Sequence, residues 1–230
     1  DTNFLISSEA FKGRFSISNP NYKNSDKSLY LSAEASENDY LKSSGYKTNK
    51  TGVRIGTNFE YFNDFYLGLN NSHFYEKIET NSSASAMQKK QEGNYWDSFI
   101  RFDMNYDKRN QKFQTSSGFK SFYSLDLPIL SDTNTLKNYY NYSHYYNFFE
   151  KNISSLSFYF ETANSLNNKN IKLSERINIP SSRLRGFERG RVGPKDGDDF
   201  IGGNYAYSVN FASNVPFIFE ESQNLDFLIF

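Results

Sequence analysis

The sequence predicts an all-β protein, a transmembrane antiparallel β-barrel, on three observations. Apolar and polar residues alternate with a period of two along almost the whole chain of 230 residues. Clusters of Asn, Ser, Gly and Asp separate the alternating runs, as turns between strands require. The chain also combines a mean hydropathy of −0.74 with 23 Phe and 18 Tyr. A barrel with a polar lumen and an aromatic outer surface explains that combination, whereas a soluble core would need more aliphatic residues.

The alternation is clearest at residues 100–106, where Ile100, Phe102 and Met104 are separated by charged residues. Such a strand has one apolar and one polar face. Several runs reach the roughly 9–11 residues that cross a bilayer on a tilt. About twelve strands are predicted, at residues 2–10, 13–19, 28–36, 49–62, 64–78, 95–108, 117–129, 135–149, 154–165, 171–177, 204–215 and 224–230.

The predicted connections alternate between tight turns, as at 63–64, and long loops, as at 80–93 and 178–203. Short periplasmic turns and long outer loops are typical of outer-membrane barrels. We therefore predict a single β-barrel domain over 1–230. Residues 139–149 carry rings on both faces, and we expect part of this stretch to lie at a membrane interface. The core of a soluble β-sandwich is the alternative.

Composition excludes several classes of function. With 26 Lys and Arg against 26 Asp and Glu, the net charge is zero and gives no field that would attract nucleic acid. Without Cys and with 2 His, thiolate chemistry and a zinc site are not expected. Ser72 and His73 point to opposite faces of a strand, and 196–199 lacks the spacing of a calcium loop. We predict neither an enzyme nor a metal or cofactor site.

Three motifs follow one another in the loop before the eleventh predicted strand: Leu-Arg-Gly-Phe at 184–187, Val-Gly-Pro-Lys at 192–195, and a stretch from Asp199 to Asn204 that contains Gly202 and Gly203. This series resembles the sixth outer loop of the BamA family, the central subunit of the bacterial outer-membrane β-barrel assembly machinery. The motif residues carried over from the second and third motifs are Gly193, Pro194, Lys195, Asp199, Gly202, Gly203 and Asn204.

Two further stretches resemble the same family. Residues 18–22 are similar to its Asn-Pro-Tyr/Phe turn between early strands. A turn in the middle of the chain is similar to its Asp-x-Arg and Phe-x-Thr-x-Gly pattern, through Asp107, Arg109, Phe113, Thr115 and Gly118. The wider superfamily, with the TamA assembly factor and the two-partner secretion transporters, shares the Arg-Gly-Phe/Tyr signature. The Gly-Pro-Lys and Gly-Gly-Asn steps resemble BamA more closely.

The resemblance implies a barrel of sixteen strands in the bacterial outer membrane, preceded by periplasmic POTRA domains. The twelve predicted strands would be its second to thirteenth, so the chain is expected to be a fragment. A genuine C-terminus at Phe230 is the alternative. The implied function is assembly and insertion of outer-membrane proteins without ATP or cofactor. Its partners would be unfolded substrates, accessory lipoproteins and lipid, and not nucleic acid.

The resemblance also implies that the loop 178–203 folds into the lumen. Arg185 would be its anchor on a lumenal carboxylate, Gly186 the turn and Phe187 the plug. The sequence departs from the family at Ala212, where the family has Glu, and the identity of the carboxylate stays open. A related translocation factor, a two-partner secretion transporter or an ordinary outer-membrane channel remain alternative functions. Substrate range and gate state are not indicated by the sequence.

Overall fold

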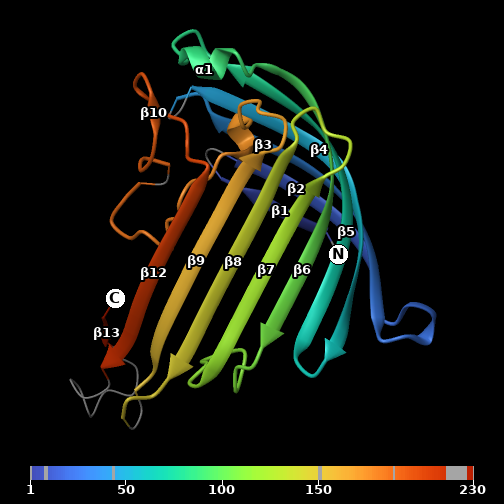
Figure 1. The fold of residues 1–230 in the computed structure, drawn as a ribbon, viewed down its shortest axis with the longest axis vertical. Coiled ribbons are helices and arrows are strands. Elements are labelled where there is room, and N and C mark those ends of the chain that lie inside the picture. The colour runs from blue at the N-terminus through green and yellow to red at the C-terminus, as the bar shows by residue number, and fades with distance from the viewer. Residues whose placement is uncertain are drawn as a thin grey trace.

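The computed structural model describes residues 2–7, 10–42, 45–149, 152–188, 190–215 and 227–229. Within them, eleven strands form one antiparallel sheet in the order β1-β2-β3-β4-β5-β6-β7-β8-β9-β12-β13. Each strand pairs with the strand before it in this order, so the sheet is a meander of hairpins. Figure 1 shows that the sheet is strongly curved, with β1 to β4 behind and β6 to β12 in front.

The eleven strands of the sheet differ in length, and nine of them, all except β1 and β13, have ten or more residues and are long enough to cross a bilayer. The strands are β1 Thr2–Ile6, β2 Ala10–Asn19, β3 Lys27–Tyr40, β4 Tyr46–Phe62, β5 Phe65–Thr80, β6 Gly93–Asp107, β7 Gly118–Pro128, β8 Thr135–Tyr146, β9 Ser154–Ser165, β12 Tyr205–Val215 and β13 Phe227–Ile229. The connections hold η1 Tyr22–Asn24, α1 Ala86–Lys89, η2 Leu173–Glu175 and the two-residue strands β10 Lys195–Asp196 and β11 Asp199–Phe200. The longest, β3 to β6, have 14 to 17 residues. Among the described residues, no helix has the length and apolar character to cross a membrane.

The predicted all-β fold is confirmed, and eleven of the twelve predicted strands are present. The predicted strand at 171–177 is wrong. Its alternation of Ile171, Leu173 and Ile177 imitates a strand, but the segment forms the turn η2 and makes a single bridge from Ile177 to Gly203. Its apolar residues are buried against the sheet instead of forming one face of a strand. Phe230 and most of the predicted strand 224–230 lie outside the described residues.

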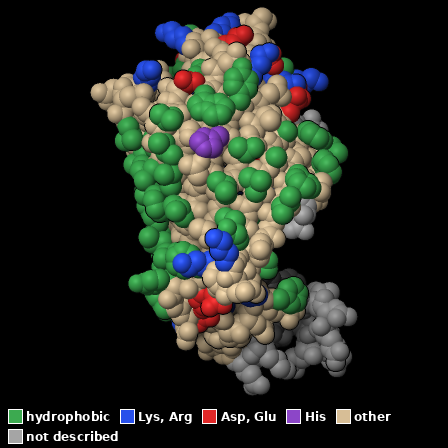
Figure 2. Space-filling view, turned by 90° about the vertical axis from the view of Figure 1, so that its right-hand side faces the viewer, with side chains coloured by type: hydrophobic (Ala, Val, Ile, Leu, Met, Phe, Trp, Pro, Cys, Tyr) green, Lys and Arg blue, Asp and Glu red, His purple; other side chains and the backbone are tan. Residues whose placement is uncertain are grey.

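The two faces of the sheet differ in chemistry, because the register places successive residues of each strand on opposite sides. The convex face is apolar. Its exposed side chains include Phe15, Ile17, Leu31, Val53, Ile55, Leu69, Trp96, Phe102, Met104, Leu156, Phe160, Val209 and Phe211. Figure 2 views the molecule from the right-hand side of Figure 1 and shows hydrophobic side chains gathered between charged groups at the top and near the bottom.

The concave face is polar and charged. It carries Glu34, Lys50, Arg54, Asn70, Glu76, Asp97, Arg101, Asp103, Asp126, Lys137, Asn141 and Glu161. An apolar convex face and a polar concave face are the pattern of a barrel wall between lipid and an aqueous lumen. A soluble sandwich would instead bury its apolar face against a second sheet, and the only other sheet among the described residues is the two-stranded hairpin of β10 and β11 in the connection before β12.

Aromatic rings form a continuous row near the end of the sheet that carries the short turns. Phe62 stacks on Phe65 at 4.6 Å between centroids, and Tyr106 contacts Phe119 at 5.2 Å. Further ring contacts extend the row to Tyr142 on β8. Rings at this level fit the interface between lipid chains and water, where an aromatic belt is stabilising.

Trp96 offers a direct test of the membrane assignment. It is the only tryptophan of the chain, and 47% of its surface is exposed on the convex face. In a reconstituted bilayer its fluorescence should be quenched by lipids brominated on their acyl chains and only weakly by iodide in the water. The matched control is Trp96→Phe combined with Phe99→Trp, which moves the indole to the polar face. Quenching of Trp96 by iodide alone would contradict the assignment.

Candidate functional site: a loop docked on the polar face

The long connection between β9 and β12 packs against the concave face of the sheet. Leu173 of η2 is buried together with Ile78 of β5 and Ile201. A second buried cluster joins Ile171 and Ile177 of the connection to Tyr159, Ala163 and Ala206 of β9 and β12. The connection therefore supplies part of the hydrophobic core, and its position is fixed by burial as well as by polar contacts.

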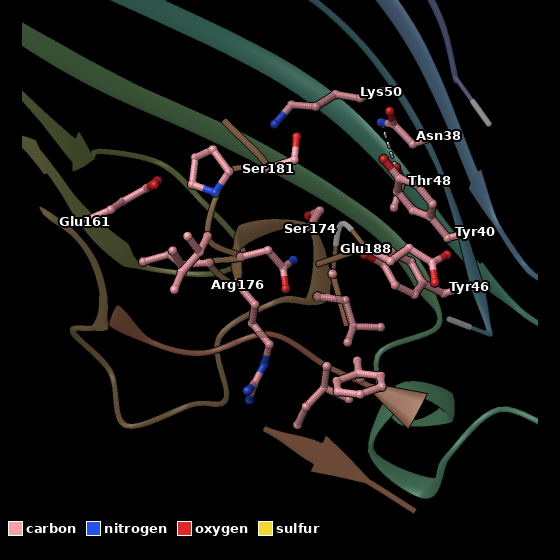
Figure 3. Close-up of a pocket in the computed structure, with 18 of the residues that line it drawn as sticks. Asn38, Tyr40, Tyr46, Thr48, Lys50, Glu161, Ser174, Arg176, Ser181 and Glu188 are labelled. Carbon is pink, nitrogen blue, oxygen red and sulfur yellow. Dashed lines mark hydrogen bonds between the residues drawn. The ribbon is translucent and has the colours of Figure 1, made fainter. Parts of the chain in front are cut away.

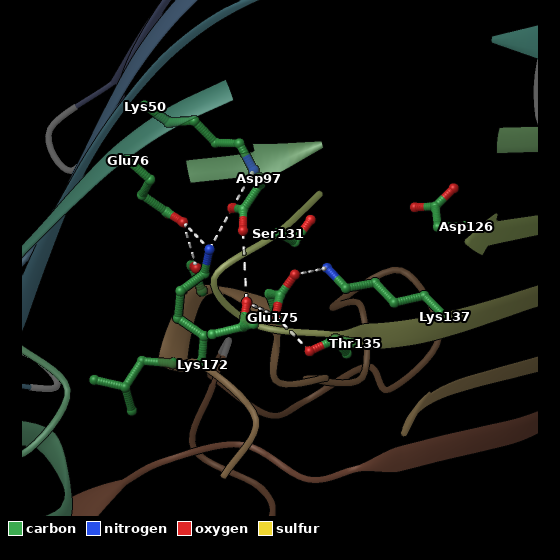
Figure 4. A network of polar contacts seen from close by, with 12 residues as sticks. Lys50, Glu76, Asp97, Asp126, Ser131, Thr135, Lys137, Lys172 and Glu175 are labelled. Atoms are coloured by element: carbon green, nitrogen blue, oxygen red, sulfur yellow. Dashed lines mark hydrogen bonds and ion pairs between the residues drawn. The ribbon is translucent and has the colours of Figure 1, made fainter. Parts of the chain in front are cut away.

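Lys172 is the most deeply buried charged residue of this connection. Its side chain is 0% exposed, and its ammonium group lies 2.7 Å from Glu76 Oε2 and donates a hydrogen bond to Asp97 Oδ2. The two carboxylates come from neighbouring strands, β5 and β6, and are almost fully buried themselves. Figure 4 shows the ammonium group between them. The loop is thus held to the wall by a buried cation that bridges two strands.

Glu175, three residues further on, also binds the wall, but as an anion. Its carboxylate accepts hydrogen bonds from Thr135 Oγ1 at 2.7 Å and Thr133 Oγ1 at 3.2 Å, and lies 3.5 Å from Lys137 Nζ. Ser174 Oγ donates to Glu76 Oε2 at 2.9 Å. The ammonium group of Lys172, just before η2, therefore binds β5 and β6, and the carboxylate of Glu175 binds β8 and the loop before it (Figure 4).

The ionisation of both groups follows from these contacts. Burial alone would lower the pKa of Lys172, but the carboxylates of Glu76, Glu175 and Asp97 outweigh it and raise the pKa above its ordinary value. Burial alone would raise the pKa of Glu175, but Lys137, Lys172 and the Thr135 hydroxyl lower it below its ordinary value. Both groups are therefore charged near neutral pH, and the ion pairs persist there.

Gln91 binds the backbone of the same segment. Its side-chain carbonyl accepts from Leu173 N at 2.8 Å, and its amide donates to Ile171 O at 3.3 Å. These two bonds satisfy buried backbone groups of an irregular segment, which would otherwise destabilise the docked position. Because Gln91 follows α1, the connection from β5 to β6 also helps to hold the loop.

Arg183 connects the later part of the loop to the wall. Its guanidinium donates to Asn141 Oδ1 on β8 and lies 5.9 Å from the centroid of the Tyr159 ring on β9. Asn210 Nδ2 on β12 donates to Arg183 O at 2.9 Å. Three consecutive strands of the sheet therefore contact this one arginine.

A cavity of 620 Å³ remains between the docked loop and the wall. Its lining is largely polar and includes Lys50, Glu161, Arg176, Ser181 and Glu188, as Figure 3 shows. The loop thus covers the concave face without filling it, and the space beneath it is accessible to water.

The predicted loop anchor lies at the surface in this structure. Arg185 and Gly186 are exposed, and Phe187 is 58% exposed. Gly186 has a φ of +83°, a left-handed conformation that favours glycine and turns the chain at the tip. The anchoring of Arg185 on a carboxylate stays a prediction. Ala212 lies on the concave side of β12, opposite Ser155, at the place where a family glutamate is expected.

The second and third loop motifs form a small hairpin. Lys195 and Asp199 lie in β10 and β11, and Ile201 N donates to Pro194 O at 3.1 Å across its base. The carboxylate of Asp199 accepts from Ser85 N at 3.0 Å, and that of Asp196 accepts from Met87 N at 2.9 Å. These bonds attach the hairpin to the start of α1, so the two aspartates join two loops.

The glycine pair of the third motif returns the chain to the sheet. Gly203 and Ile177 exchange backbone hydrogen bonds of 2.8 and 2.9 Å. Asn204 O then accepts from Ala163 N at 2.8 Å, where β12 begins to pair with β9. Gly193 precedes the hairpin with a φ of +136°, and Gly202 follows it with a φ of +73°.

The predicted turn between β6 and β7 is locked by its own side chains. Asp107 accepts two hydrogen bonds of 2.7 Å from the guanidinium of Arg109, and Thr115 Oγ1 donates to Gln111 O at 2.7 Å. Gly118 has a φ of +94°, and a Cβ there would lie 2.1 Å from Lys108 O. Only glycine fits at that position. Phe113 is at the tip and is 81% exposed.

Comparison with known proteins agrees with this geometry. The family model described as the Omp85 superfamily domain matches residues 2–230. The chain belongs to the Omp85 superfamily. Among solved structures, this Omp85 chain is similar to BamA from Haemophilus ducreyi lacking POTRA domains 1–3, with a TM-score of 0.87 and 19% identity. The match covers 96% of this chain and 48% of that one. No curated protein matches the sequence significantly.

One prediction from the docked loop concerns Lys172. Replacing it by Met leaves Glu76 and Asp97 buried without their cation, which should cost about 3–5 kcal/mol. The loop should become susceptible to trypsin, which cleaves after Arg183, Arg185 and Arg191. The matched control is Lys169→Ala, since Lys169 is exposed in the same connection. Equal cleavage rates for the two variants would show that Lys172 does not hold the loop.

A second prediction compares two arginines of the loop. Because Arg183 contacts the wall and Arg185 is exposed, Arg183→Ala should destabilise loop docking by about 1.5–3 kcal/mol, the usual cost of a hydrogen bond to a charged group. Arg185→Ala should cost no more than about 1 kcal/mol. Trypsin cannot be used for these variants, so chymotryptic cleavage after Leu184 or Phe187 is the measurement. A larger effect of Arg185→Ala would identify Arg185 as the main anchor, as the family resemblance implies.

The lowered pKa of Glu175 predicts a dependence on pH. The contribution of the Glu175 carboxylate to docking is complete above the ordinary carboxyl pKa of about 4.3. It is lost as the pH falls through the lower pKa that Glu175 has in the folded protein. The chain has no Cys, so a spin label at Ser181→Cys reports loop mobility. Mobility should rise only below about pH 4. Glu175→Gln should be more mobile already at pH 7 and change less with acid; identical pH curves would contradict the assignment.

Proposed function

We propose that this chain forms part of the barrel of an outer-membrane protein insertase of the BamA type, in the bacterial outer membrane. The observation that carries the proposal is the docked loop. A loop with the Arg-Gly-Phe, Gly-Pro-Lys and Gly-Gly-Asn motifs is held by Lys172 and Glu175 on the polar face of a sheet whose other face is apolar.

The physical basis of the proposed activity is strand pairing. The edge of an antiparallel sheet presents unpaired N–H and C=O groups, and an incoming strand can satisfy them. In lipid such groups have no water to bind, so pairing with a substrate strand is strongly favoured. A docked loop keeps the wall rigid while an edge opens. No ATP or cofactor is needed, because the free energy comes from folding of the substrate.

The proposed partners follow from the two faces and the two ends of the sheet. The apolar convex face contacts lipid, and unfolded outer-membrane proteins are the substrates. Accessory lipoproteins are proposed to bind at the end with the short turns, where the rigid turn of Asp107 and Arg109 presents the exposed Phe113. We propose no catalytic residue, and nucleic acid is not a partner.

The experiment uses the intact protein reconstituted in liposomes. A urea-denatured outer-membrane barrel is added, and its folding is followed by the shift in gel mobility on heating. Liposomes with the protein should fold the substrate at least ten times faster than empty liposomes. Lys172→Met should lose most of this acceleration, while Lys169→Ala should retain it.

Two results would contradict the proposal. Equal folding rates in empty and loaded liposomes would remove the insertase assignment. Export of a soluble substrate across the bilayer without any effect on barrel folding would assign the protein to the secretion transporters of the superfamily instead.

A further inference from the structure

An ionisable side chain of β5, His73, lies on the apolar convex face of the sheet. The register pairs it with Val53 of β4 and Ser98 of β6, and it shares its side of β5 with the exposed Leu69. An imidazole among lipid chains is costly unless its nitrogens are hydrogen-bonded. His73 therefore needs a polar partner at each nitrogen.

One nitrogen of His73 has its partner within the protein. Nδ1 lies 2.9 Å from the hydroxyl oxygen of Ser98. Nε2 has no hydrogen-bond partner among the described residues. When the Ser98 hydroxyl donates to Nδ1, the imidazole proton is on Nε2. His73 then presents a free donor to the surroundings of the convex face.

Trp96 of β6 supplies a second donor beside His73. The two rings are inclined by 25°, and their centroids are 6.1 Å apart. The indole Nε1 is a donor only, and it has no hydrogen-bond partner in the part of the chain that the structure describes. Two stacked rings on the outer surface of the wall therefore each carry one unbonded N–H group.

The aromatic rings of β5 indicate the level of these two donors in a membrane. Phe65 belongs to the row near the short turns, and Tyr75, ten residues further along β5, is paired with Trp96. Ten residues of a strand cover about 34 Å, or about 24–28 Å across the membrane at a tilt of about 35–45°. The apolar band between two aromatic girdles is about 25 Å. Tyr75 and Trp96 thus mark the outer boundary of the band, and His73 lies about 5 Å below Tyr75.

The loop after β7 supports the same level. β7 ends at Pro128, which is paired with Phe99, and the backbone of β6 above this point is bound by the loop. The carboxylate of Asp132 in this loop accepts from Trp96 N at 2.6 Å. A carboxylate belongs among lipid headgroups and not among acyl chains. The two free donors therefore lie where headgroups and acyl chains meet.

We propose that the stacked rings of His73 and Trp96 bind the ester carbonyls of one lipid in the outer leaflet. Ester oxygens only accept hydrogen bonds, and they join the acyl chains to the headgroup, at the level of the two N–H groups. A lipid phosphate is disfavoured, because the cation next along this side of β5, Lys77, is already paired with Glu79 at 2.6 Å. The inference rests on the membrane placement in the proposed function and not on insertase activity.

The test compares vesicles of an ester-linked phosphatidylcholine with vesicles of its ether-linked analogue, which has equal chains and headgroup but no carbonyls. The gel-mobility shift gives the temperature at which the intact protein unfolds. We expect the wild type to unfold about 2–4 °C higher in the ester lipid. His73→Phe keeps a flat ring but has no donor, so it should lose at least half of this difference.

The matched control is Asn71→Leu. Asn71 is a polar residue on the same side of β5, paired with Ile55 and Ile100, and it lies about 10 Å below Tyr75, out of reach of the esters. This variant should retain the full difference between the two lipids.

Solid-state NMR in the ester vesicles measures the contact itself. The chain has 2 His, so His144→Gln leaves His73 as the only residue labelled with ¹⁵N-histidine. Magnetisation should pass from Nε2 to ¹³C-labelled ester carbonyls of the lipid and not to its phosphorus.

Three results would overturn the ester site: equal differences for the wild type and His73→Phe, no transfer to the carbonyls, or transfer to phosphorus in their place, which would assign a headgroup phosphate. Quenching of Trp96 by brominated lipid in the same vesicles separates such a failure from a failure of the membrane placement. If that quenching is seen, the proposed function stands although the lipid site does not.

Discussion

The buried ammonium group of Lys172 is the interaction on which the arrangement of the loop depends. It lies between carboxylates of two adjacent strands, and all three side chains are removed from water. A buried ion pair adds little net stability over an apolar contact, but loss of one partner is costly. Such a pair therefore specifies one position of the loop more than it stabilises the fold. It can form only when η2 lies at this height on β5 and β6.

The difference in chemistry between the two faces of the sheet allows the ion pairs to specify one position of the loop. Because the middle of its convex face is apolar, the wall can stand against lipid, and the charges in the middle of the strands are placed on the concave side. Charges on a shared concave surface are close enough to compensate one another across strands. The loop supplies Lys172, Glu175 and Arg183 to this surface and completes its pairing.

The period of two in the sequence was sufficient to predict most of the fold. It predicted the strands around Ile100 and Phe102 and the side on which they face, because alternation directly reports the two sides of a strand. It failed at 171–177, where alternate apolar residues belong to a docked loop. Periodicity alone does not distinguish a strand from an irregular segment that buries the same residues, and the backbone bonds from Gln91 have no local signal.

The contacts of Lys172, Glu175 and Arg183 with the wall were not predicted from the sequence, for a related reason. Motif resemblance directed attention to Arg185, whereas the structure places Lys172, Glu175 and Arg183 on the wall. A lysine between Ile171 and Leu173 was the available signal, since a charge inside an apolar run requires a buried partner. Its partners, Glu76 and Asp97, are about 75 to 96 residues away in sequence, and only the register of the strands brings them together.

A double-mutant cycle with Lys172→Met and Glu76→Gln tests the central claim most directly. The free energy of loop docking would be measured by hydrogen exchange of the 171–177 amides in the wild type, both single variants and the double variant. If the pair is coupled, the double variant should be more stable than the sum of the single effects predicts, by at least about 1.5 kcal/mol. Additive effects, within about 0.5 kcal/mol, would contradict the account.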